Sequence, residues 1–149
     1  MSTSLRERFG RPLRLAVIGG GPESWIGRMH RGAAEMDGHW RVVAGVFSSD
    51  AARSRTAGAS MGFDAARCYG DITELLARER QRKDGVDALA IMTPNDTHYA
   101  YAAAALTPAW TWCVTSRSRT TLRRPAIWSR GHTAVAVCSR LPTPTRPTP

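Results

Sequence analysis

Three consecutive glycines, Gly19, Gly20 and Gly21, end a short apolar run and are the residues best suited to approach a ligand closely. The run before them, LAVI, is typical of a strand that is buried on both faces. Ser24 follows as a candidate N-cap for a helix. A strand, a glycine turn and a helix N-terminus together present backbone N–H groups and a positive dipole end to a phosphate. This stretch therefore predicts a phosphate-binding turn.

The spacing of the glycines departs from the G-x-G-x-x-G pattern of dinucleotide-binding folds. Gly19 and Gly21 fit its first two positions, but Ser24 stands at the third and the next glycine is Gly27. Glycine is needed where a side chain would hold a pyrophosphate away from the backbone. The alternative, a strand-to-helix turn of an α/β protein with no ligand, stays open on this stretch alone.

A second group of polar residues follows the next predicted strand, residues 41–47. Ser48, Ser49, Asp50 and Arg53 lie where dinucleotide folds contact the adenosine ribose. An acid there favours an unphosphorylated ribose, whereas serines with a nearby arginine accept a 2′-phosphate. The sequence offers both, so NAD and NADP stay open as cofactors. Asp50 could also serve only as a helix N-cap.

These positions require a scaffold of alternating strands and helices. Strands are predicted for residues 13–18, 41–47 and 86–92, with a short one at Cys68 and Tyr69, and helices for 24–36, 50–60, 71–81 and 96–106. The alternation predicts an α/β fold with a doubly wound parallel sheet and right-handed crossovers. In such a sheet a ligand binds at the carboxyl ends of the strands.

The charge is uneven along the 149-residue chain, whose length suits one domain. Residues 1–106 hold 14 Arg and Lys against 12 Asp and Glu, whereas residues 107–149 hold seven Arg, no acid and six of the nine prolines. We expect a flexible N-terminus over residues 1–12 and an irregular or disordered tail over residues 107–149. The arginines of the tail form no helical stripe or ordered aromatic platform, which disfavours nucleic-acid binding.

Several other classes of site and location are disfavoured by the sequence. The three cysteines lack C-x-x-C spacing, and the four histidines are scattered, so we expect no disulfide framework, no metal site and no catalytic triad. The N-terminus lacks the apolar core of a signal peptide, and no run is long enough to span a membrane. A cytoplasmic protein is therefore expected.

Two motifs give the chain a family resemblance over residues 13–106. I-G-x-x-H ends at His30, in the first predicted helix, and T-P-N-x-x-H ends at His98, after the last predicted strand. With the glycine turn and Ser48-Ser49, this resembles the Gfo/Idh/MocA oxidoreductases, relatives of glucose-fructose oxidoreductase and inositol dehydrogenase. The resemblance implies a partial NAD(P)-binding Rossmann domain, and full-length relatives that act on sugars, inositols or similar polyols and can be homo-oligomers. The predicted cofactor contacts are Gly19, Gly21, Ser24, Ile26, Gly27, Ser48, Ser49, Asp50, Arg53, Thr93, Pro94, Asn95 and His98.

The family's next segment is a strand ending in a Glu-Lys-Pro or Asp-Lys-Pro turn, whose lysine is usually assigned a catalytic role. Residues 106–117, LTPAWTWCVTSR, contain no lysine. Read from the third base of each codon, this segment can encode D-A-G-L-D-V-V-C-D-K-P-L. In the same frame residues 137–149 can encode V-L-A-V-T-H-T-Y-S-A-Y-P, similar to a V-T-H-x-Y motif of the family. We hypothesise that one base was lost near the codons for Leu106 and Thr107, so that residues 107–149 are out-of-frame translation; a divergent genuine tail is the alternative.

This hypothesis has consequences for the fold and for activity. The parallel sheet is expected to be incomplete, with the outer edge of its last strand open. The expected function is the N-terminal dinucleotide-binding part of an NAD(P)-dependent oxidoreductase, with no catalytic residue in this chain, weak dinucleotide binding and no turnover. The alternative is a nucleotide-binding module without a reaction of its own.

Overall fold

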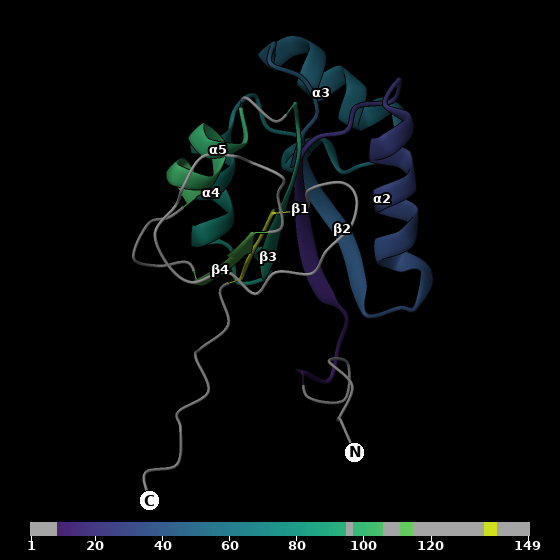
Figure 1. Cartoon of the computed structure of the whole chain (residues 1–149), viewed down its shortest axis with the longest axis vertical. Coiled ribbons are helices and arrows are strands. Elements are labelled where there is room, and N and C mark those ends of the chain that lie inside the picture. The colour runs from purple at the N-terminus through teal and green to yellow at the C-terminus, as the bar shows by residue number, and fades with distance from the viewer. Residues whose placement is uncertain (1–8, 95–96, 106–110, 115–135, 140–149) are drawn as a thin grey trace, which may run out of the picture.

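The computed structural model describes residues 9–94, 97–105, 111–114 and 136–139 (Figure 1). Strands and helices alternate through the first part of this range, as predicted. In chain order the elements are β1 (Leu13–Gly19), α2 (Trp25–Met36), β2 (Trp40–Val46), α3 (Ala51–Ser60), the 3₁₀ helix η1 (Ala65–Arg67), α4 (Ile72–Gln81), β3 (Ala88–Met92), α5 (His98–Ala105), β4 (Thr111–Val114) and β5 (Ala136–Ser139).

The central strand of the parallel part is β1, which pairs with β2 on one side and β3 on the other. Ile18, near the end of β1, lies opposite both Val46 and Ile91. The three strands therefore end at the same edge of the sheet, which is where a doubly wound fold binds its ligand.

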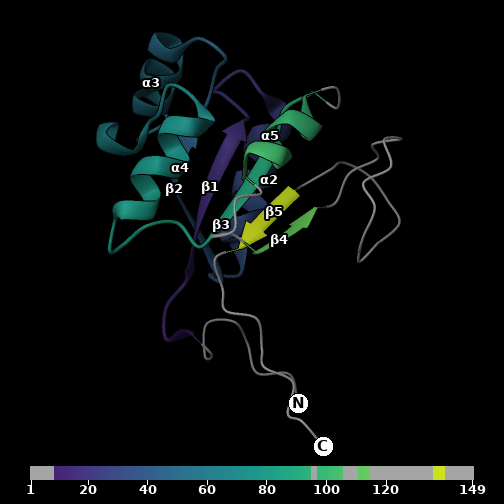
Figure 2. The ribbon, with the colours of Figure 1, turned by 90° about the vertical axis from the view of Figure 1, so that its left-hand side faces the viewer.

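Helices cover both faces of this sheet. On one face, Leu15 and Val17 pack in a cluster with Ala34 of α2 and Ala57 of α3. On the other, Ala16 and Ile18 pack with residues of α4 and α5, among them Ile72, Leu75, Ala102 and Ala105. Figure 2 shows α4 and α5 in front of the sheet and α2 behind it. The predicted Rossmann-type, doubly wound arrangement is confirmed.

Side-chain caps explain where the helices begin. Ser24, Asp50 and Asp71 each precede a helix, and each accepts a hydrogen bond from the backbone N–H three residues later. Such caps satisfy an N–H group that would otherwise lack a partner in the first turn.

The helices in the described part of the chain are all too short or too polar to span a membrane.

The predicted short strand at Cys68 and Tyr69 is reduced to a single bridge between Cys68 and Gly45. The backbone N–H of Tyr69 donates to the carbonyl of Gly45 at 2.9 Å, and the cap of α4 follows at Asp71. The segment between η1 and α4 is therefore too short to form a ladder along β2.

The outer edge of β3, which we expected to be open, is paired with β5. This pairing is antiparallel, and β4 in turn pairs with β5, so that the strand order is β2-β1-β3-β5-β4. Among the described residues, β3 is the last strand of the parallel part of the sheet; that the domain is incomplete stays a prediction. An exposed edge presents free N–H and C=O groups, so it can pair with any extended segment within reach. The rest of the predicted tail, and residues 1–8, lie outside the described residues.

Candidate functional site

The glycine turn lies between the ends of β2 and β3. Gly19 has a φ of +82°, and a Cβ there would be 2.8 Å from the carbonyl oxygen of Met92, in β3. A Cβ on Gly21 would be 2.8 Å from the carbonyl oxygen of Phe47, directly after β2. The turn therefore approaches both neighbouring strands too closely to carry side chains at these positions.

The helix α2 packs directly on the same turn. Gly20, with a φ of +66°, is in contact with Gly27, and a Cβ on Gly27 would overlap the backbone of Gly20. This is the close approach of helix to strand that a fingerprint glycine permits in dinucleotide-binding folds. Gly20 was not among the predicted site residues, although its place inside a run of three glycines was the available signal.

Three backbone donors at the start of α2 are free to bind an anion. Ser24 accepts from the N–H of Gly27 at 3.0 Å, and its own N–H donates to the carbonyl of Gly21 at 2.9 Å. Within the described residues, the N–H groups of Glu23, Trp25 and Ile26 have no protein acceptor. Free N–H groups at the positive end of a helix fit a phosphate.

An unpredicted arginine supports the turn from the side. Arg31, a partly exposed residue of α2, donates through Nη1 to the carbonyl oxygen of Gly20. Burial, and then the charge of Arg28, lower the pKa of Arg31, while Glu35 acts in the opposite direction. Arg31 forms no ion pair among the described residues, so its positive charge is available to a bound anion. The sequence signal was its position one turn after Gly27, on the same side of the helix.

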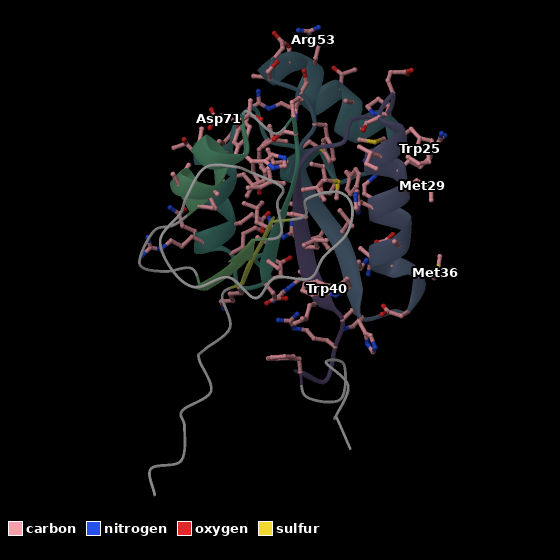
Figure 3. All side chains as sticks on the ribbon, in the orientation of Figure 1. Trp25, Met29, Met36, Trp40, Arg53 and Asp71 are labelled. Carbon is pink, nitrogen blue, oxygen red and sulfur yellow. The ribbon has the colours of Figure 1, made fainter. Side chains whose placement is uncertain are left out.

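The residues after β2 are held mainly by the start of α3. Asp50 accepts through Oδ1 from the N–H of Arg53 at 2.7 Å, and Ser48 accepts from the N–H of Asp50 at 3.2 Å. Ser49, Asp50 and Arg53 are exposed, and Figure 3 shows Arg53 at the end of the molecule where the strands finish. Asp50 is therefore a helix cap whose carboxylate remains accessible, so the capping role does not exclude contact with a ribose.

A buried serine, also unpredicted, fixes the end of β2. The Ser54 hydroxyl accepts from the N–H of Phe47 at 2.8 Å and donates to the carbonyl of Tyr69 at 2.6 Å. Ser54 is fully buried. It thereby ties the loop that follows β2 to the segment that precedes α4.

The turn after β3 contains the T-P-N-x-x-H motif. The Thr97 hydroxyl donates to that of Thr93 at 2.8 Å, and Nε2 of the buried His98 lies 2.6 Å from the carbonyl oxygen of Thr93. His98 therefore holds the backbone of this turn. Pro94 is exposed, and Asn95 lies outside the described residues.

The predicted site residues that the structure describes thus gather at one edge of the sheet, around the ends of β1, β2 and β3. Their contact with a cofactor stays a prediction, as does the direct role of Ile26, which is half-buried in the first turn of α2. No group of histidine, cysteine and acidic side chains in the described part of the chain could hold a metal ion.

Comparison with known proteins gives a consistent picture. Residues 13–109 match the Gfo/Idh/MocA family model, described as an oxidoreductase family with an NAD-binding Rossmann fold. An uncharacterized oxidoreductase of Bacillus subtilis, YfiI, is 42% identical over 99 residues, which cover 66% of this chain and 25% of the relative.

Solved structures agree with this match. An oxidoreductase from Pseudomonas syringae is 44% identical with a TM-score of 0.61, covering 64% of this chain and 26% of that one. An inositol dehydrogenase homolog from Azotobacter vinelandii, complexed with NADH and myo-inositol, is 42% identical with a TM-score of 0.63, covering 70% and 27%. The same homolog complexed with NAD+ gives 45% identity and a TM-score of 0.61, covering 64% and 25%.

The chain spans about a quarter of the length of these relatives. The match covers the residues that carry the glycine turn and all three parallel strands. The chain belongs to the Gfo/Idh/MocA oxidoreductase family, and residues 13–109 match its NAD-binding Rossmann fold.

Proposed function

We propose that the glycine turn binds the pyrophosphate of a nicotinamide dinucleotide. The observation that carries this proposal is the set of free N–H groups at Glu23, Trp25 and Ile26, next to a turn that has no side chains between two strand ends. Arg31 adds positive charge behind the turn. When bound, the cofactor supplies the hydride chemistry, and the protein's part is to bind and orient it.

We further propose that the cofactor is NAD rather than NADP. The exposed Asp50 carboxylate can accept hydrogen bonds from a ribose, whereas it would repel a 2′-phosphate. Two structures of the Azotobacter vinelandii homolog, which contain NAD+ and NADH, support this choice. Calorimetric titration should give tighter binding of NAD than of NADP, and the Asp50→Asn variant should narrow the difference. Equal affinities in the wild-type chain would contradict the choice of NAD.

The donor role of the turn can be tested at Trp25, the first residue of α2. Proline is tolerated at this helix position and lacks the backbone N–H, so Trp25→Pro should bind NAD about tenfold more weakly than Trp25→Ala, the loss of one hydrogen bond to a charged group. Trp25→Ala is the matched control, because it removes the same side chain and keeps the N–H. If both variants bind NAD equally well, the pyrophosphate does not lie on this turn.

We propose that the substrates of full-length relatives are inositols, sugars or similar polyols, and that the 149-residue chain binds cofactor without turnover. The myo-inositol in a structure of the Azotobacter vinelandii homolog supports the substrate class. This chain corresponds to only about a quarter of that protein and has no lysine after Lys83. Reduction of NAD with myo-inositol by the pure chain would refute the absence of turnover.

We also propose that residues 107–149 are translated out of frame. The family match ends at residue 109, close to the proposed shift at Leu106 and Thr107, and the composition changes at the same place. The coding DNA tests this directly: codons that cannot give Lys-Pro in the shifted frame would overturn it. Expression of the frame-restored gene then separates the two candidate functions, because an oxidoreductase would gain turnover and a nucleotide-binding module would not.

A further inference from the structure

An apolar face of α2 points away from the sheet. Trp25, Met29 and Met36 are 65%, 52% and 86% exposed, and they are the exposed large hydrophobic residues of the described part of the chain. Figure 3 shows them along the outward side of α2. Spacings of four and seven residues place them on one face of a helix. A single exposed apolar side chain is ordinary, but a continuous stripe of them indicates an interaction surface.

The middle of this stripe is open to a second backbone. Gly32 lies between Met29 and Met36 on the same face, and a Cβ there would have no atom within 4 Å. Ala33 follows it and is exposed. The distance between packed helices depends on the side chains at their contact, so another helix can approach α2 most closely at Gly32.

Two oppositely charged residues lie beside the stripe, and two copies of the helix can pair them with each other. Arg28 and Glu35 are both exposed and stand two turns apart on the same flank of α2. Glu35 accepts from the N–H of Val42 through Oε1, which holds its side chain on this flank. In an antiparallel pair of α2 helices, related by a two-fold axis midway between these residues, Arg28 of each copy faces Glu35 of the other.

The same two-fold axis also brings apolar side chains of the two copies into contact. The midpoint between Arg28 and Glu35 falls beside Gly32, where the helices can approach most closely. Helix geometry then brings Met36 of one copy next to Trp25 of the other, a favourable contact between sulfur and an aromatic ring. One charge register therefore aligns both ends and the centre of the stripe.

We propose that α2 docks antiparallel on α2 of a second copy of this chain. The contact is isologous and closes as a dimer. A single helix pair forms a small interface, so the dimer is weak and exchanges rapidly. The side chain of Trp25 lies in this contact, whereas its backbone N–H belongs to the proposed phosphate site, so the two sites adjoin at the start of α2.

Sedimentation equilibrium of the full chain, from micromolar to submillimolar concentration, tests the proposal. A reversible monomer–dimer equilibrium is expected. Met36→Lys should weaken it at least tenfold, whereas Ala52→Lys, the same added charge on the exposed side of α3, should not change it. A monomer at all concentrations, or a dimer that is insensitive to Met36→Lys, would overturn the proposal.

Cysteine and charge-reversal variants test the antiparallel register. Gly32→Cys should give, under mild oxidation, a disulfide between the two introduced cysteines, identified by peptide mass spectrometry; Ala52→Cys is the control that should not. Arg28→Glu should weaken the dimer, and the double variant Arg28→Glu with Glu35→Arg should restore it. A dimer that forms no such disulfide and is not restored by the double variant uses another surface.

Discussion

Two polar regions of the molecule differ in how many of their hydrogen-bonding groups have a partner within the protein. At the glycine turn, the N–H groups of Glu23, Trp25 and Ile26 have no acceptor among the described residues. Beside the amino end of β3, the fully buried carboxylate of Glu79 accepts several hydrogen bonds. The first N–H groups of a helix have no partner within the helix, so those at the glycine turn are open to a ligand or to water, whereas the groups around Glu79 are already paired within the protein.

The cluster around Glu79 is closed to any further partner. Arg67 donates to it through Nε at 2.9 Å, the Tyr69 hydroxyl donates at 2.7 Å, and the N–H of Val86 donates at 3.0 Å. Burial, and then the hydrogen bond to Glu79, raise the pKa of Tyr69, so the phenol keeps its proton. These contacts join η1, α4 and the approach to β3, which makes the cluster a structural feature.

The largest expected effect is the loss of one partner in this cluster. Arg67→Met leaves the Glu79 charge buried without its guanidinium, which should lower the free energy of unfolding by about 3–5 kcal/mol. Urea denaturation followed by circular dichroism measures the change. The double variant Arg67→Met with Glu79→Leu should recover part of the loss. If Arg67→Met is as stable as the wild-type chain, the ion pair does not hold α4 in place.

A substitution at the glycine turn is expected to lower both the stability of the fold and the affinity for NAD. In Gly27→Ala the new methyl group overlaps Gly20, so it should cost about 1–3 kcal/mol and abolish NAD binding. Gly32→Ala, five residues later in the same helix with open space around it, should instead stabilise α2 slightly. Retained NAD binding in Gly27→Ala would show that the contact between helix and turn is not needed for the site.

A variant of Arg31 tests the contribution of charge to ligand binding separately from that of packing. Arg31→Met keeps an apolar stem on α2 but removes the guanidinium at Gly20, and should weaken NAD and ADP binding about tenfold. Binding of adenosine, which has no phosphate, should be unchanged, and calorimetry with the three ligands measures the difference. Equal losses for all three would indicate that Arg31 acts only on the shape of the turn.

Asp87 offers a smaller effect that depends on pH. Burial alone would raise its pKa, but hydrogen bonds from Arg11 and from the N–H of Arg14, with their charges, lower the pKa below its ordinary value of 3.8. The carboxylate therefore stabilises the fold above that pH, and the contribution is lost as the pH falls below about 4. Asp87→Asn should cost about 1 kcal/mol at pH 7, and its stability should converge with that of the wild-type chain in acid. A constant difference across this range would assign the effect to packing.

Much of this arrangement could be predicted from local sequence. The caps at Ser24, Asp50 and Asp71 and the apolar runs of β1 to β3 predicted the elements to within two residues at most ends, because capping and strand burial are short-range signals. The edge of β3 was different, since its pairing with β5 joins residues far apart in the chain. No local pattern contains that information.

The candidate site shows the same division. Gly19, Gly21 and Gly27 were predicted from spacing, and the structure shows the close backbone approaches that require glycine at these positions; their contact with a cofactor stays a prediction. Arg31 and Ser54 were missed because their roles depend on which backbone carbonyls or N–H groups the fold brings near them. Arginine and serine occur in many environments, so their types alone did not mark these positions.

The smallest predicted effect is at Glu23, an acid within the turn itself. Its side chain is exposed, so its charge repels a bound pyrophosphate through solvent, and screening limits the penalty. Glu23→Gln should therefore strengthen NAD binding about two- to threefold at low salt, as expected for a few tenths of a kcal/mol, with little change at high salt or in adenosine binding. The same substitution at Glu74, an acid in α4 outside the turn, is the control. If Glu23→Gln leaves NAD binding unchanged at low salt, the phosphates do not lie over the start of α2, and the free N–H groups there serve only solvent.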